Sequence, residues 1–169
     1  MFAHLTLPGW FHFLAGLAAL VLGLLVFLLP KGTRVHRAAG TAYVAAMLVV
    51  CLSAFGIYAI NGRPGVFHVL AAVSLTSLTL GMLNLRRWRR TREPARLAAH
   101  YQHMAYSYLG LFMAFVSQML VNPRFVGDWV PGRTAFALAL IAINLALYAA
   151  GSIAIRRWRR RAMGRYAPA

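Results

Sequence analysis

Five stretches of the chain are dominated by apolar residues, and each is long enough to cross a membrane as a helix. At about 1.5 Å per helical residue, about 20 residues span the roughly 30 Å hydrocarbon core of a bilayer. Clusters of Pro, Gly, Asn and Arg separate the stretches. The pattern predicts an all-α integral membrane protein, a five-helix transmembrane bundle in a single domain over residues 1–169, with spans at about Gly9–Leu29, Ala38–Ile60, Val66–Leu85, His103–Val121 and Ala135–Ile155.

An apolar motif occurs twice in the chain, as PGWFHFLAG at 8–16 and as PGVFHVLAA at 64–72. Aligning the two copies pairs the first span with the third and the second span with the fourth. The chain is then expected to form two parallel helical hairpin repeats plus one added helix, because both hairpins begin on the same side of the membrane. Matched residues of the two hairpins should therefore lie at matched depth.

Basic residues are distributed unevenly between the connecting segments. The chain has 18 Lys and Arg against two acidic residues, a formal net charge of +16. Fifteen of the 18 lie in segments 31–37, 86–96 and 156–165, and three lie in 61–65 and 122–133. The positive-inside rule then predicts a multi-pass protein of the cell inner (plasma) membrane, with the amino terminus outside and the carboxyl terminus cytoplasmic. The bilayer explains this charge without a nucleic-acid partner.

Paired histidines are the candidate cofactor ligands. His12 and His68 occupy the same place in the repeated motif, near the outer boundary, and His36 and His100 follow basic segments near the inner boundary. The two layers should lie roughly 20 Å apart at about 1.5 Å per helical residue. His103 is a further inner candidate, and His4 lies outside both layers. Haem b held edge-on between helices needs two imidazoles on opposite faces, so these four histidines are the predicted haem and metal ligands.

Small residues follow three of these histidines by one helical turn: Gly16, Gly40 and Ala72. They would leave room beside the imidazoles for a flat group, although Gly and Ala are also common packing residues in membrane helices. Near the inner layer, Arg37, with Arg34 or Arg96, could pair with haem propionates.

The shortage of carboxylates excludes most catalytic sites. The two acids, Glu93 and Asp128, fall in connecting segments. A carboxylate pair, a Ser-His-Asp triad or a zinc site with a general base each needs an acid near the reacting atoms, so no catalytic residue is predicted. Asn144, in the middle of the fifth span, is expected to bond to another helix. Cys51 is expected to be a small packing residue.

Two boxes resemble an uncharacterised prokaryotic family of integral membrane proteins, a domain of unknown function. The boxes are HRAAGTAY at 36–43, with the pattern HRxxGxxY, and HYQHMAYSYLGL at 100–111, with the pattern HxxxMxxSY. The resemblance covers roughly residues 36–121 and favours His100 over His103 as the partner of His36. It implies a membrane architecture and carries no activity.

Two hypotheses for function follow. The first is a b-type haem-binding membrane protein that transfers electrons within or across the membrane, with a quinone or another redox partner. The second is a cofactor-free membrane scaffold or small-molecule carrier with interfacial histidines. Whether the protein is an enzyme stays open.

The charge asymmetry predicts a topology that reporter fusions can test. A reporter active only in the cytoplasm should work when fused after Ala169 and fail when inserted at 61–65, because the basic segments are retained inside. The opposite pattern of activity would overturn the predicted orientation.

Overall fold

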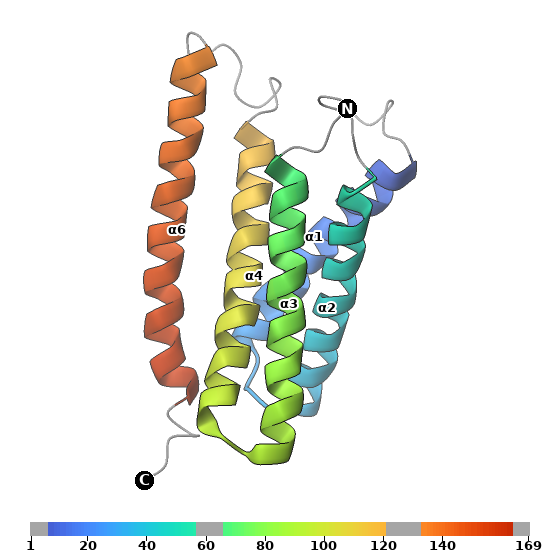
Figure 1. Cartoon of the computed structure of the whole chain (residues 1–169), viewed down its shortest axis with the longest axis vertical. Helices are drawn as coiled ribbons and strands as arrows, with labels where there is room; N and C mark the ends of the chain where they lie inside the picture. The colour runs from blue at the N-terminus through green and yellow to red at the C-terminus, as the bar shows by residue number, and fades with distance from the viewer. Residues whose placement is uncertain (1–6, 57–65, 121–132, 164–169) are drawn as a thin grey trace.

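The computed structural model describes residues 7–56, 66–120 and 133–163, which are mainly helical, with short turns at 29–33 and 92–93 (Figure 1). The prediction of an all-α bundle is confirmed. Residues 57–65 and 121–132, which were predicted to connect spans on the outer side, and His4 lie outside the described residues. The described helices are α1 (Leu7–Leu28), α2 (Arg34–Ala54), α3 (Val66–Thr91), α4 (Pro94–Leu120) and α6 (Arg133–Met163).

The helices are arranged as two antiparallel hairpins with one further helix. α1 packs along α2 and α3 along α4, and the hairpins join where α2 meets α3 and where α1 meets α4. Figure 1 shows α1, α3 and α6 running one way and α2 and α4 the other. α6 packs against α4, outside the other four. The first four helices thus form a ring in which α1 faces α3 and α2 faces α4 across the diagonals.

Four of the described helices, α1, α2, α3 and α6, are long and apolar enough to cross a membrane. α4 is similar in length, with 27 residues, but it is not among these four. It contacts α1, α3 and α6 and buries two serines, Ser107 and Ser117. A helix covered by three neighbours needs less apolar surface than a lipid-facing one, because its polar groups face the bundle interior.

The helices continue past the predicted span limits at the basic end of the bundle. α3 runs to Thr91, α4 begins at Pro94 rather than at His103, and α6 continues to Met163. Arginine is a good helix former, so the helices do not have to end where the apolar residues end. The turn between α3 and α4 is consequently short, and it uses a positive φ of 58° at Arg92.

The turn from α1 to α2 is held by side chains that cap both helix ends. Thr33 accepts a hydrogen bond from the His36 backbone N–H at the start of α2. Lys31 Nζ donates to the carbonyls of Val26 and Phe27 at 2.7 and 2.8 Å, which satisfies the end of α1. Burial lowers the pKa of the Lys31 ammonium from its ordinary value.

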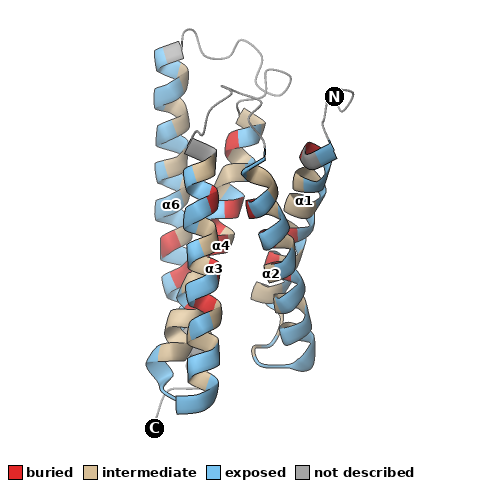
Figure 2. Cartoon of the chain, turned by 45° about the vertical axis from the view of Figure 1, so that its right-hand side comes forward, coloured by how far each residue is buried: buried red, intermediate tan, exposed pale blue. Residues whose placement is uncertain are grey.

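The core lies where α1, α2, α3 and α4 meet, and Figure 2 shows exposed residues along the outward sides of the helices. Tyr43, Met47, Cys51 and Leu78 are buried, which agrees with Cys51 as a packing residue. Gly23 of α1 allows close packing, because a Cβ there would overlap the Tyr108 ring and touch Tyr43. The lipid-facing side of α1 instead carries exposed Leu14, Leu17, Val21, Leu24 and Leu28.

Two glycines of α1 should respond oppositely to the same substitution. Gly23→Ala forces the Tyr108 ring to move and should destabilise the folded protein by about 1–3 kcal/mol. Gly16→Ala is the matched control, because its Cβ would meet nothing within 4 Å. It should be neutral or stabilise by up to about 1 kcal/mol through helix propensity. Reversible unfolding in detergent, followed by circular dichroism, measures both; equal effects would contradict the packing described.

Candidate functional site

A cavity of about 650 Å³ lies in the ring of α1–α4, in the half of the bundle that contains the starts of α1 and α3. His12 of α1 and His68 of α3 both line it, together with residues of α2 and α4 and with Tyr148 of α6. The lining is mostly apolar, and its volume falls within the roughly 300–1,000 Å³ of small-molecule and cofactor sites. The two histidines of the repeated motif therefore share one cavity.

Hydrogen bonds define the protonation of His12. Its Nδ1 lies 3.1 Å from the Val50 carbonyl oxygen and 3.0 Å from Ser53 Oγ, both on α2. A carbonyl only accepts, so Nδ1 carries the proton, and Ser53 can accept as well because its own hydroxyl donates to the Val49 carbonyl. In the neutral ring, Nε2 then keeps its lone pair, the arrangement found in histidines that bind metals.

Open space lies beside His12. A Cβ on Gly16 or on Gly110, both of which line the cavity, would meet nothing within 4 Å. Packing within the described residues therefore does not require either glycine. On α3 the lining includes Ala71 but not Ala72, which is exposed. The residue on the His68 side of α3 one turn later is therefore Ala71, three positions on, rather than Ala72, four positions on.

His36 of α2 and His100 of α4 both lie at the opposite, basic end, and His100 is one of the groups that act electrostatically on His36. His100 Nδ1 donates to the Gly81 carbonyl of α3 at 2.9 Å, which again leaves Nε2 with a lone pair. His36 Nδ1 is buried and has no hydrogen-bond partner within the described parts of the chain. A Cβ on Gly40, one turn after His36, would also meet nothing within 4 Å.

The remaining inner candidates have other surroundings. Ser77 of α3 donates to the His103 backbone carbonyl at 3.0 Å. Arg34 and Arg37 are exposed in the first turn of α2, and Arg96 pairs with Glu93. Within the described residues, no group of three or more His, Cys, Asp or Glu converges to hold a metal ion.

The two sequence boxes meet through a buried hydrogen bond between α2 and α4. Tyr43 Oη lies 2.9 Å from Ser107 Oγ, and the Ser107 hydroxyl donates to the Met104 carbonyl at 2.8 Å, so the tyrosine is the donor. The two helices run in the same direction, and each box places this residue seven positions after its histidine. His36 and His100 therefore lie at about the same level along the bundle, and Tyr43 meets Ser107 about two turns further along.

Both histidine pairs connect diagonal helices of the ring. His12 and His68 belong to α1 and α3, and His36 and His100 belong to α2 and α4. In helical bundles, cofactor sites are built from side chains on facing helices. Two of these histidines lie near each end of the bundle, on helices that face each other across the ring.

Comparison with known families supports the assignment of the chain as a membrane protein. Residues 9–152 match the family described as predicted membrane protein (DUF2306). The chain belongs to this family. No curated protein and no solved structure matches the chain. DUF2306 is a family of unknown function, so membership supports the membrane assignment and assigns no role to the histidines.

The sequence did not predict several residues that surround the histidines in this DUF2306 protein. The carbonyls of Val50 and Gly81 orient His12 and His100, and backbone acceptors have no sequence signature. Ser53 and Gly110 also belong to the site. A serine or glycine in an apolar helix signals close packing or a nearby polar group, but it does not identify the neighbour. Asn144 does bond to another helix, as expected, through Ser117 of α4 at 3.0 Å.

Removing the Ser107 hydroxyl should cost more than removing an ordinary helix hydroxyl. Ser107→Ala leaves the buried Tyr43 hydroxyl without an acceptor and should destabilise by about 1–3 kcal/mol. Thr79→Val is the control, since its exposed hydroxyl bonds to its own helix, and it should change stability by under about 0.5 kcal/mol.

Adding Tyr43→Phe to Ser107→Ala should recover part of the loss, because both partners are then apolar. The unfolding free energies of the three variants in one detergent test this. A double variant less stable than Ser107→Ala alone would show that the hydrogen bond is not what links the boxes.

Proposed function

We propose that the protein binds b-type haem through histidine pairs on the diagonals of its four-helix ring and transfers electrons within or across the membrane. One observation carries this: both histidines of the repeated motif line a single cavity from opposite helices. The outer site is formed by His12 and His68, and the inner site by His36 and His100. The bundle supplies ligands near both faces of the bilayer.

The surroundings of the imidazoles suit axial ligation of haem iron. His12 and His100 each direct Nδ1–H at a backbone carbonyl, which fixes the ring and raises the basicity of Nε2. Beside His12 and His36, Gly16 and Gly40 leave open space for the edge of a flat ring. Bound haem supplies one-electron chemistry, and the chain holds and orients it and excludes water through the apolar lining.

The two sites differ in charge. The described lining of the outer cavity contains no charged side chain. At the inner site, Lys31 lies near enough to His36 to interact electrostatically, and Arg34 and Arg37 begin the same helix. Haem propionates at the inner site would therefore find cationic partners on α2 and on the turn before it.

A second candidate function is a carrier for an uncharged, lipid-soluble molecule. It is favoured by the same uncharged lining and by exposed lining residues on α1 and α3, Leu17, Leu70 and Val73. These apolar residues open the cavity toward the bilayer rather than toward water. A quinone or a similar ring with a long apolar tail would fit this chemistry.

Histidine variants separate the two sites. His12→Ala and His68→Ala should each abolish or strongly weaken one haem, because either loss removes an axial bond at the outer site. His36→Ala and His100→Ala should form a second matching class at the inner site. Visible absorption spectra of the reduced, purified proteins, expressed with ample haem, report the haem content.

His103→Ala is the matched control, because it removes a neighbouring imidazole and should retain both haems. Loss of the same haem in His12→Ala and His100→Ala would contradict the assignment of the pairs. A haem-free protein that binds a quinone in the outer cavity would favour the carrier.

A further inference from the structure

The corner between α3 and α4 concentrates positive charge. Residues 86–96 contain six arginines and one carboxylate, Glu93, a net charge of +5 (six minus one). The helices are nearly continuous through this segment, since α3 ends at Thr91 and α4 begins at Pro94. Apart from Arg92, which lies in the turn, the arginines are therefore placed on helical turns. We call Arg86, Arg87 and Arg90, which are exposed on the last turns of α3, the arginine corner.

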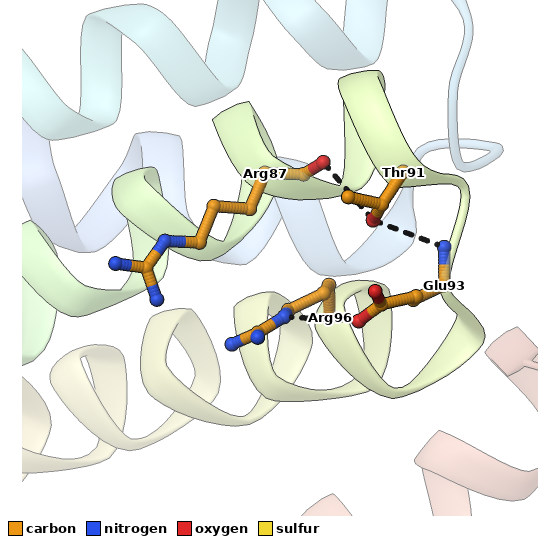
Figure 3. A network of polar contacts seen from close by, with 4 residues as sticks. All are labelled: Arg87, Thr91, Glu93 and Arg96. Carbon is orange, nitrogen blue, oxygen red and sulfur yellow. Dashed lines mark hydrogen bonds and ion pairs between the residues drawn. The ribbon is translucent and has the colours of Figure 1, made fainter.

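The one carboxylate of this segment, Glu93, is already paired with an arginine of the same segment. Glu93 accepts a hydrogen bond from Arg96 Nε at 3.2 Å, and its backbone N–H donates to Thr91 Oγ1 (Figure 3). Figure 3 shows the Arg87 guanidinium extending away from Glu93. The described residues of the corner therefore contain no second acid to balance its charge.

The other arginines of the segment face different groups. Arg89 interacts electrostatically with His100, and the Arg92 guanidinium lies 5.0 Å from the centre of the Trp88 ring. By helical spacing, Arg90 shares a face with both Arg86 and Arg87, one turn away. Like charges at this spacing repel one another, so an anion between them would relieve the repulsion.

The position of the arginine corner along the membrane normal identifies the anion. α3 has 26 residues and is about 39 Å long, which exceeds the roughly 30 Å hydrocarbon core. Its apolar residues end at Leu85, and Trp88 is a residue typical of the membrane interface. The guanidinium groups thus lie at the level of lipid phosphates.

We propose that the arginine corner is a binding site for the phosphate of an anionic phospholipid. Arginine suits this ligand because its planar guanidinium donates two parallel hydrogen bonds to phosphate oxygens. The acyl chains would lie along the exposed apolar residues of α3, such as Leu80 and Leu83. The proposal is independent of haem.

Native mass spectrometry of the full-length protein with added lipid tests the site. Phosphatidylglycerol should bind at least about tenfold more tightly than phosphatidylcholine with the same acyl chains. Each arginine near an anionic lipid contributes about fivefold in affinity. The variant Arg86→Gln/Arg87→Gln/Arg90→Gln should therefore lose up to about a hundredfold in phosphatidylglycerol affinity, which removes the preference.

The matched control is Arg156→Gln/Arg157→Gln/Arg159→Gln on α6, which removes the same charge elsewhere and should keep the preference. Glycerol phosphate at millimolar concentration should not displace the lipid. Equal binding of the two lipids, an equal loss in both triple variants, or displacement by glycerol phosphate would each overturn the proposal. Circular dichroism of both variants verifies that the helices are intact.

Discussion

Polar side chains inside a bilayer must find their partners within the protein, and this constraint governs how the helices of the bundle are arranged. Water cannot satisfy a hydroxyl, an amide or an imidazole at that depth, so a polar side chain bonds either to its own helix or to a neighbouring helix that it holds close. Ser107 links α4 to α2 through Tyr43, and Ser117 links α4 to α6 through Asn144. α4 makes these bonds because it lies in the middle of the bundle.

The histidines follow the same rule, with a further consequence for chemistry. His12 and His100 each satisfy one ring nitrogen on the backbone of the neighbouring helix. The other nitrogen then keeps a lone pair. A backbone carbonyl therefore both anchors the ring and prepares it to bind a ligand. One histidine of this kind, His12, belongs to the α1–α3 diagonal, and the other, His100, belongs to the α2–α4 diagonal. The two ends of the bundle therefore offer similar chemistry on different pairs of helices.

The sequence predicts the helices because apolar runs of about 20 residues match the thickness of the bilayer. The motif that occurs twice predicts how the helices pair. It also predicts His12 and His68 near one end, and in the structure both line one cavity. The contacts around them depend on helix rotation, which sequence spacing resolves only to within a residue. Ala72 was expected beside His68, for example, but the residue that lines the cavity one turn after His68 is Ala71. The carbonyl partners of the histidines could not be predicted, since every residue has a carbonyl.

The haem-to-protein ratio of the wild-type chain, purified after expression with ample haem, tests the central claim most directly. The account predicts two b-type haems per chain, with the low-spin spectrum expected of iron ligated by two imidazoles, and an equal content of iron by elemental analysis. A colourless protein without iron would contradict it.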